Sequence, residues 1–345
     1  MRKLPVNEFL EKEWRNYPLL DVRSPGEFEA GHIPGALNLP LFSDEERAIV
    51  GTLYKQKGPQ IAFQKGLEVA GKKLPWYVEE ARRLVQGSQK IAVHCWRGGQ
   101  RSGSLAWLLS FSGFDVAVLE GGYKAYRRCV HAQFGECALR SVVLGGATGS
   151  GKTAVLKTLR EMGEQVLDLE GIAHHKGSAF GALGETPQPS VEQFENNLFD
   201  ALKDLDTHRR VWVENESRSI GRVFLPEGLW HRLQRSPLVQ LEVPFENRVA
   251  YLVEVYGTFP VGSLEASFLR IEKKLGGQHL KTALQALQSG DYATAAAIAL
   301  KYYDKTYAYT TSKGDFDPII PLYDSSKDHT QTALRLKQLA DEHGL

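Results

Sequence analysis

The chain of 345 residues has few cysteines and no long apolar run. Its three cysteines, Cys95, Cys129 and Cys137, are an odd number without a C-x-x-C spacing, which excludes a disulfide framework and indicates no zinc site. A membrane helix needs roughly 20 consecutive apolar residues, and the longest candidate, 104–119, is broken by polar residues. The N-terminal segment is charged and lacks the apolar core of a signal peptide. We therefore expect a cytoplasmic protein with no membrane segment.

The chain also lacks an excess of either charge, because it contains 42 Lys and Arg residues and 41 Asp and Glu residues. The balance is uneven, since residues 1–137 hold 19 basic against 15 acidic residues. Basic and aromatic residues gather in segment 47–90, a mixture that can hold phosphates and stack the bases of a nucleic acid. A solvated helical face over core aromatics fits this segment equally well. The residues concerned are Arg47, Lys55, Lys57, Lys65, Lys72, Lys73, Arg82, Arg83 and Lys90, with Tyr54, Phe63, Trp76 and Tyr77 between them.

Strand-like and helix-like segments alternate along the chain, which predicts an α/β fold with parallel sheets covered by helices. The length suits two domains, and a new strand begins at 141 after an irregular polar stretch. We expect a domain at 1–137 and a second at 138–345 that ends in a helical tail. Segment 293–300 is only a helix-favouring alanine stretch. The expected strands are 18–22, 90–94, 116–119, 141–145, 165–169, 210–214 and 239–243, and the expected helices include 104–111 and 153–162.

The segment KIAVHCWRGGQRSGSLAWLL is typical of a strand, a tight loop and a helix, with Cys95 at the end of the strand. Two glycines permit sharp loop conformations, so backbone N–H groups can converge near the positive end of the helix. A thiolate is stabilised there, which lowers its pKa and makes it reactive. The loop predicts a nucleophile in an anion site rather than a cysteine that packs as a small apolar residue. The predicted site comprises Cys95 and Arg101 with Arg97, Gly98, Gly99, Gln100 and Ser102.

This segment resembles the rhodanese-like domains. The upstream sequence LLDVRSPGEFEAGHIPGALNLP matches their N-terminal signature, and LEGGY at 119–123 resembles their closing motif. In that family the loop cysteine carries sulfur as a persulfide or, in related proteins, acts on phosphate. Five residues separate Cys95 from Arg101, one more than in many sulfur carriers and as many as in phosphatase-like relatives. The cargo therefore stays open, and the signature residues Asp21, Arg23 and His32 are expected to fix loops rather than to react.

A second motif follows strand 141–145. The sequence GGATGSGKT fits the phosphate-loop pattern G-x-x-x-x-G-K-[ST], between a strand and an amphipathic helix as the pattern requires. Its backbone N–H groups would cradle phosphate oxygens at the helix N-terminus, with a lysine adding charge and a threonine able to ligate Mg²⁺. The predicted phosphate-binding residues are Gly146, Thr148, Gly149, Ser150, Gly151, Lys152 and Thr153.

Acidic residues after two further strands are candidates to hold Mg²⁺ or to contact the substrate. They are Asp168, Glu170, Glu214 and Glu216. The adjacent His174 and His175 would diverge on a regular element, so a metal pair is not expected, and no metal ligand set is certain. We expect no tightly bound cofactor. Solvated helix surfaces are the expected place for Arg248, Arg270, Lys273 and Lys274, although each could reach a phosphate.

Together, CWRGGQRS, GGATGSGKT and DLEGIAHHKGSAFG resemble the bacterial tRNA 2-selenouridine synthases over nearly the whole chain. The resemblance implies a transferase whose partner is a tRNA with wobble 2-thiouridine, with Lys, Glu and Gln acceptors. It implies that geranyl diphosphate first alkylates the thio group and that selenophosphate then delivers selenium while geranylthiol leaves. Under this hypothesis Cys95 accepts selenium as a perselenide, and the phosphate loop holds the diphosphate.

Two alternatives fit parts of the sequence. In one, a rhodanese-type sulfurtransferase is fused to a nucleotide-dependent kinase or NTPase. In the other, the chain is an RNA- or protein-binding module with degenerate sites, which the intact Cys95 and Lys152 argue against. The phosphate loop alone fits geranyl diphosphate, a nucleotide or a tRNA phosphate.

Overall fold

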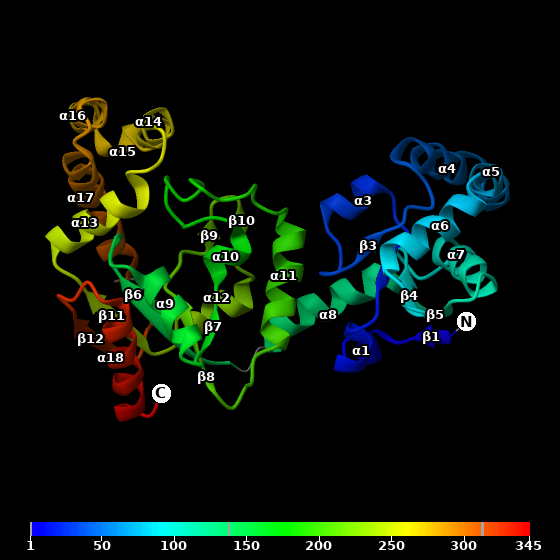
Figure 1. The fold of residues 1–345 in the computed structure, drawn as a ribbon, viewed down its shortest axis with the longest axis horizontal. Coiled ribbons are helices and arrows are strands. Elements are labelled where there is room, and N and C mark those ends of the chain that lie inside the picture. Colours follow the sequence, from blue (N-terminus) through cyan, green and yellow to red (C-terminus); the bar gives the residue numbers. More distant parts are fainter. Residues whose placement is uncertain (1, 137–138, 312–313) are drawn as a thin grey trace. The chain divides into compact units, whose positions relative to one another are not determined.

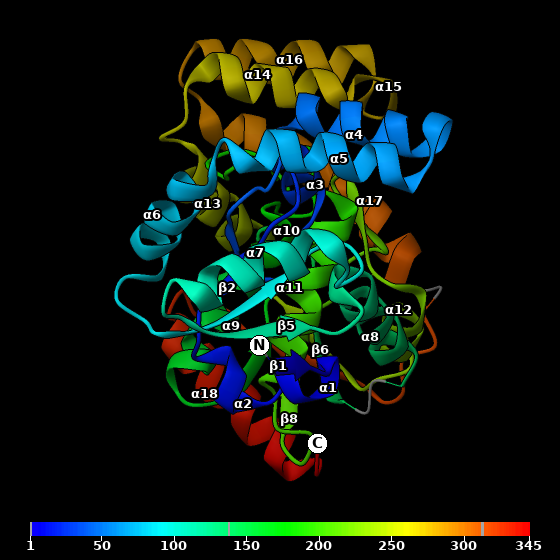
Figure 2. The ribbon, with the colours of Figure 1, turned by 90° about the vertical axis from the view of Figure 1, so that its right-hand side faces the viewer.

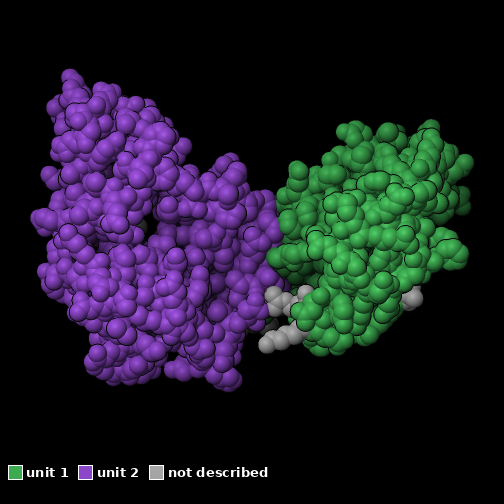
Figure 3. All heavy atoms as spheres, in the orientation of Figure 1, with its two compact units in different colours: residues 1–133 green, residues 134–345 purple. Residues whose placement is uncertain are grey.

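The computed structural model describes residues 2–136, 139–311 and 314–345 (Figure 1). The chain divides into two compact units, residues 1–133 and 134–345, which Figure 3 draws in separate colours. The boundary that the sequence predicts, after residue 137, lies outside the described residues. Among the helices that are described, none combines the length and the apolar character needed to cross a bilayer.

Unit 1 is built on a five-stranded parallel sheet with the order β1-β5-β4-β2-β3. Its strands are β1 (Arg2–Leu4), β2 (Leu19–Asp21), β3 (Leu37–Asn38), β4 (Lys90–His94) and β5 (Asp115–Leu119). Four of the five residues of the central strand β4 are buried, as expected for a parallel sheet covered on both faces. The predicted strands at 18–22, 90–94 and 116–119 are confirmed. Strands β1 and β3 are too short for any period to be recognised in the sequence.

The helices of unit 1 are α1 (Val6–Phe9), α2 (Lys12–Arg15), α3 (Pro25–Ala30), α4 (Asp44–Lys57), α5 (Pro59–Gly71), α6 (Leu74–Val85), α7 (Gln100–Phe111) and α8 (Gly122–Glu136). Helices α3 and α4 each begin with a capping box, in which a serine and a glutamate satisfy each other's backbone N–H groups. Helices α4 and α5 lie side by side (Figure 2). Helix α7 follows β4 after a short loop, so this loop lies at the carboxyl end of the central strand.

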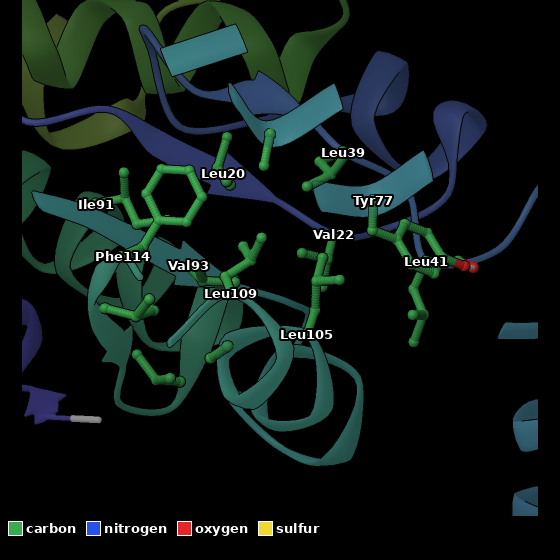
Figure 4. Close-up of a cluster of buried hydrophobic side chains, with 14 of the residues drawn as sticks. Leu20, Val22, Leu39, Leu41, Tyr77, Ile91, Val93, Leu105, Leu109 and Phe114 are labelled. Carbon is green, nitrogen blue, oxygen red and sulfur yellow. Dashed lines mark hydrogen bonds between the residues drawn. The ribbon is translucent and has the colours of Figure 1, made fainter. Parts of the chain in front are cut away.

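The core of unit 1 forms where the sheet meets α6 and α7 (Figure 4). Val93 from β4 and Leu105 and Leu109 from α7 are fully buried in one cluster. Tyr77 from α6 is buried with them, because its hydroxyl donates a hydrogen bond to the carbonyl oxygen of Leu41 at 2.6 Å. The sequence grouped this tyrosine with aromatics that could stack on bases. The structure instead places it in the core.

Unit 2 contains a second parallel sheet with the order β12-β11-β6-β8-β7. Its strands are β6 (Arg140–Gly146), β7 (Gln165–Leu167), β8 (Arg210–Glu214), β11 (Leu238–Glu242) and β12 (Ile319–Tyr323), and a separate antiparallel pair comprises β9 (Ser219–Ile220) and β10 (Val223–Phe224). The four predicted strands of this unit are confirmed, the one at 210–214 with the predicted ends and the other three with shifted ends. The tail predicted to be helical also carries β12, which forms an edge of the sheet.

The helices of unit 2 are α9 (Lys152–Glu161), α10 (Leu169–Ala173), α11 (Val191–Lys203), α12 (Glu227–Leu233), α13 (Phe245–Tyr256), α14 (Val261–Arg270), α15 (Glu272–Leu275), α16 (Gly277–Gln288), α17 (Tyr292–Thr311) and α18 (His329–Glu342). Helix α9 buries Val155, Leu156 and Leu159, the face that the sequence predicted. Helices α14 to α17 share an apolar cluster of their own, separate from the cluster that packs on the sheet. Within it, α14 and α16 lie side by side (Figure 2).

Candidate functional site

Cys95 begins the loop between β4 and α7, and its side chain is only 3% exposed. Its Sγ lies 3.2 Å from the Oγ of Ser102, in the first turn of α7. Burial raises the pKa of the Cys95 thiol, but the Ser102 hydroxyl, the backbone N–H groups of Arg97 and Ser102 and the charge of Arg101 together hold it below its ordinary value. The predicted nucleophile is therefore surrounded by donors that favour its thiolate.

The shape of this loop depends on glycines from two motifs. Gly98 has a φ of +63°, and a Cβ there would lie 2.6 Å from the carbonyl oxygen of Leu119. A Cβ on Gly122 of the LEGGY motif would lie 2.3 Å from the carbonyl oxygen of Cys95. The cysteine loop and the LEGGY segment therefore lie so close together that neither Gly98 nor Gly122 could carry a side chain. Gly99 has a φ of −99° and open space around it, so only the first of the two loop glycines needs the conformation predicted for both.

Arg101, which the sequence predicts to hold an anion, is paired in the structure with Glu27. Its Nη1 donates to the Glu27 Oε2 at 2.7 Å, and Arg47 lies 3.4 Å from the other carboxylate oxygen. The sequence noted this glutamate only as part of the rhodanese-like signature. Arg97 and Gln100 are exposed at the mouth of the loop, and Arg97 has no ion-pair partner within the described part of the chain. An anion entering the loop therefore competes with Glu27 for the guanidinium of Arg101.

A buried network joins the rhodanese-like signature to the strand that carries the cysteine. Arg23 and Asp21 form an ion pair at 2.6 Å, and the Nη2 of Arg23 also donates to the carbonyl oxygen of Gly31 at 2.7 Å. The guanidinium lies 3.9 Å from the ring centroid of Tyr123. The Nε2 of His94 lies 3.6 Å from Asp21, and burial lowers the pKa of this histidine. These contacts fix loops and leave Asp21 and Arg23 away from solvent.

In unit 2 the phosphate loop joins β6 to α9. The Lys152 Nζ donates to the carbonyl oxygen of Gly146 at 2.8 Å and lies 3.6 Å from the carboxylate of Glu214. The Thr153 hydroxyl donates to the Glu170 carboxylate at 3.0 Å. Six of the seven predicted phosphate-binding residues line one cavity, while Ser150 is buried behind it. These six are Gly146, Thr148, Gly149, Gly151, Lys152 and Thr153.

Three of the four acidic candidates meet beside this loop. Carboxylate oxygens of Glu170, Glu214 and Glu216 lie within 4.8 Å of one another. Burial, followed by the charges of the other two, raises the pKa of Glu170 to about 9. Burial and the charge of Glu214 likewise raise the pKa of Glu216 to about 8. A divalent cation would relieve this repulsion, and oxygen donors are the ligands that Mg²⁺ prefers, so the residues present fit this ion.

Asp168 does not join these carboxylates. It precedes α10, where it accepts a hydrogen bond from the N–H of Gly171 at 2.8 Å and caps the helix. Its other close partner is Arg160, at 3.9 Å. The neighbouring His174 forms a hydrogen bond with the carbonyl oxygen of Pro187 at 3.1 Å. The segment from Asp168 to His174 therefore forms part of the cavity wall, and the carboxylate of Asp168 caps α10.

The cavity at the phosphate loop has a volume of about 1000 Å³, and its lining includes several basic residues besides the glutamates. Lys176, Arg270 and Lys274 line it together with the loop. Arg270 and Lys274, which were expected on helix surfaces, thus reach the phosphate cavity, whereas Lys273 does not line it. With Lys157 and Arg160, which also line it, the cavity offers a highly charged anion five cationic side chains in addition to Lys152.

Arg248, expected at the surface, is buried and holds the phosphate loop from outside. Its guanidinium donates two hydrogen bonds of 2.7 Å to Asp304 of α17, and its Nη1 also donates to the carbonyl oxygen of Thr148 at 3.1 Å. The N–H of Gly146 donates to the hydroxyl of Tyr307, also on α17, at 2.7 Å. These partners are 56 to 161 residues apart in the chain, so no local motif could predict them.

The segment 47–90 forms α4, α5 and α6, and its charge is partly neutralised. Five of its basic residues each form an ion pair with a glutamate, namely Arg47, Lys65, Lys73, Arg83 and Lys90. Lys55, Lys57, Lys72 and Arg82 are exposed and have no ion pair within the described residues. Tyr54, Phe63 and Trp76 are exposed beside them. The surface that the structure presents is therefore smaller than the sequence suggested, but it still combines cations with aromatic rings.

Comparisons with known proteins cover both units. A family model described as a rhodanese-like domain matches residues 6–129, and one described as the tRNA 2-selenouridine synthase AAA domain matches residues 139–260. The tRNA 2-selenouridine synthase of Sulfurovum sp. (strain NBC37-1) is 34% identical over 90% of this chain and 93% of its own. That of Bdellovibrio bacteriovorus is 38% identical over 81% of this chain and 82% of its own.

These similarities confirm the predicted fold class, a rhodanese-like parallel-sheet domain followed by a phosphate-loop domain. They extend along most of both chains rather than over either domain alone. The chain therefore belongs to the tRNA 2-selenouridine synthase family.

Proposed function

We propose that this protein converts the wobble 2-thiouridine of tRNA to 2-selenouridine in two transfer reactions. Geranyl diphosphate first alkylates the sulfur, and selenophosphate then replaces the alkylated sulfur with selenium. The observation that carries this proposal is that a chain of this family holds two anion sites of different chemistry, one at a reactive thiol and one at a phosphate loop. The tRNAs that accept lysine, glutamate and glutamine are the proposed substrates, as the resemblance to the family implies.

The phosphate loop is the proposed site of geranyl transfer. The sulfur at C2 attacks C1 of the geranyl group, the C–O bond breaks, and diphosphate leaves with both bonding electrons. Lys152, Lys176 and Arg270 face the cavity where negative charge would grow on the diphosphate. Donors already in place for that charge lower the barrier, because little reorganisation is needed during the reaction.

A magnesium ion is the proposed partner of the glutamate cluster. Glu170, Glu214 and Glu216 would hold it, and it would neutralise charge on the departing diphosphate. Thr153, whose hydroxyl now donates to Glu170, stands at the position where phosphate loops supply a further oxygen ligand. The protein's part is to keep two buried carboxyl groups and the half-buried one of Glu216 close together in the wall of the phosphate cavity.

The Cys95 loop is the proposed site where selenophosphate is split. A perselenide on Cys95 would carry selenium two electrons above selenide, so its formation would release phosphite and its use would consume a reductant. Attack of the thiolate on phosphorus releases no phosphite and needs no reductant. It forms an S–P bond and releases selenide; water then hydrolyses the phosphocysteine to phosphate. Selenide attacks C2 of the alkylated uridine, and geranylthiolate leaves and takes up a proton. We favour this second route because the loop has the length found in phosphatase-like relatives.

The two routes leave different phosphorus products. Phosphorus NMR of a single-turnover reaction with S-geranylated tRNA should show phosphate for attack at phosphorus. Phosphite as the product would support the perselenide and overturn the route proposed here.

Mass spectrometry of 2-thiouridine tRNA, incubated with protein, geranyl diphosphate and selenophosphate, tests the function itself. The product expected is 2-selenouridine. Replacing Cys95 by alanine should abolish selenation and leave S-geranyluridine, whereas replacing Lys152 should impair geranylation first. Turnover of ATP without any dependence on geranyl diphosphate would instead favour a sulfurtransferase fused to an NTPase.

A further inference from the structure

Beside the phosphate cavity lies a second pocket whose walls are almost entirely apolar. Thr148, Ser178, Leu252, Tyr256 and Tyr303 line both spaces, so the two join at the phosphate loop. The residues that line only the apolar pocket come from α13, α14, α16 and α17 and from the segment before α11. They are Phe180, Val253, Gly257, Leu264, Phe268, Leu287, Tyr292, Ala295, Ala296 and Ala299.

The pocket exists because one of its walls is made of alanines. Ala295, Ala296 and Ala299 lie on α17, which crosses an apolar cluster that contains Phe180 and Phe268. Larger side chains at these positions would fill the space, as they do in most helix packings. The sequence suggested only a helix-favouring alanine stretch at 293–300. The structure shows that these small residues keep an apolar space open next to a phosphate site.

The size of the pocket limits what it can hold. Its volume of about 60 Å³ equals the share that roughly two water molecules take up in the liquid. That space admits the branched end of one five-carbon unit, and its apolar lining offers such a group few competing polar partners. A longer chain would have to lie partly in the shared mouth, with its first carbons close to the phosphate loop.

We propose that this pocket binds the distal isoprene unit of a prenyl diphosphate whose diphosphate sits in the phosphate loop. The inference rests on the proposed function, because it assumes that the anion in the loop carries a hydrocarbon chain. It adds that residues of α14, α16 and α17 determine the length of the prenyl chain that the protein accepts. A ten-carbon chain places its second isoprene unit in the pocket, and a fifteen-carbon chain meets the closed wall at Phe268 and Leu287.

Replacing Ala296 by leucine tests the pocket directly, with Ala293→Leu as a matched control on the same helix. Ala296 lines the pocket, whereas Ala293 is exposed and does not line it. The change Ala296→Leu should weaken binding of geranyl diphosphate about 30-fold, because two or three buried methylene contacts are lost. Binding of inorganic diphosphate should stay as in the wild-type protein, which also shows that the variant is folded. The control should match the wild type for both ligands.

The outcomes separate the pocket from the function. Equal geranyl diphosphate binding by Ala296→Leu and the wild type, with geranyl transfer intact, would overturn the pocket and spare the function. A wild-type protein that neither binds geranyl diphosphate more tightly than inorganic diphosphate nor transfers its geranyl group would overturn both.

A second variant enlarges the pocket and keeps the proposal testable if Ala296→Leu does not fold. Replacing Phe268 by leucine should raise the rate of farnesyl transfer relative to geranyl transfer about 10-fold, since the wall that stops the longer chain recedes. A ratio unchanged from the wild type would overturn the assignment of this wall.

Discussion

At the scale of single residues, Cys95 shows how the pKa of a buried thiol can be held below its ordinary value. Burial alone would keep the proton on sulfur, but the hydroxyl of Ser102 and two backbone N–H groups point at the sulfur. These donors favour the thiolate before substrate arrives. The role of Ser102 is therefore electrostatic, and its removal should be visible in the titration of the thiol.

Replacing Ser102 by alanine should raise the pKa of Cys95, since the thiolate loses a hydrogen bond that is worth roughly 1.5 kcal/mol. Thiolate formation would then require a higher pH, and alkylation of Cys95 by iodoacetamide at pH 7 should slow about 10-fold. The measurement is the pH dependence of alkylation, with Cys95→Ala to subtract the other cysteines. Ser104→Ala is the matched control, because Ser104 lies on the same helix and bonds only to backbone carbonyls. An unchanged midpoint in Ser102→Ala would show that the amides alone hold the thiolate.

At the scale of elements, α17 connects the phosphate loop to the apolar pocket. One turn of this helix supplies Asp304, which pairs with Arg248, and the next supplies Tyr307, which binds the first residue of the loop. Earlier turns carry the alanines of the pocket. A single rigid element thus sets the distance between the loop and the apolar walls. The phosphate loop and the apolar pocket are therefore coupled through one helix.

Replacing Asp304 by asparagine should loosen this connection. Arg248 would keep its burial but lose its counter-ion, and the partial exposure of Asp304 limits the cost to about 1–3 kcal/mol of unfolding free energy. Affinity for inorganic diphosphate should fall about 10-fold, because Arg248 without its counter-ion holds the carbonyl of Thr148 less firmly. Thermal unfolding and calorimetric titration measure the two effects. Asp291→Asn, at the exposed start of the same helix, should change neither, and selenation of tRNA already geranylated should be unaffected.

The face made by α4, α5 and α6 is the second element with a testable role. Changing Lys55, Lys57, Lys72 and Arg82 to glutamine should weaken tRNA binding and reduce the slope of log K against log salt by roughly 3, because each cation releases counter-ions on binding phosphate. The matched control neutralises Lys65, Lys73, Arg83 and Lys90, which already have carboxylate partners. Filter binding at several salt concentrations distinguishes the two sets. Equal losses from both would falsify a specific role for the unpaired cations.

At the scale of the whole molecule, local motifs predicted the two sites and long-range contacts completed them. The strands, the cysteine loop and the phosphate loop could be predicted because each is encoded within about 15 consecutive residues. Glu27, which holds Arg101, and Asp304, which holds Arg248, could not, since each partner lies 56 or more residues away. The apolar pocket was missed for the same reason, as its walls span residues 148 to 303. An alanine stretch indicates a helix but not the space that it leaves.

Each unit has its own sheet, its own core and its own chemical site, which suggests that the two reactions are separable. A Cys95→Ala protein should geranylate 2-thiouridine tRNA and stop, and a Lys152→Ala protein should selenate only tRNA that is already geranylated. If the intermediate is released between the sites, mixing the two variants should restore 2-selenouridine, although neither variant forms it alone. Nucleoside mass spectrometry of the single and mixed reactions measures this, with the double variant mixed with itself as the control. Accumulation of S-geranyluridine in the mixture, with no selenouridine, would mean instead that the tRNA stays on one chain for both steps.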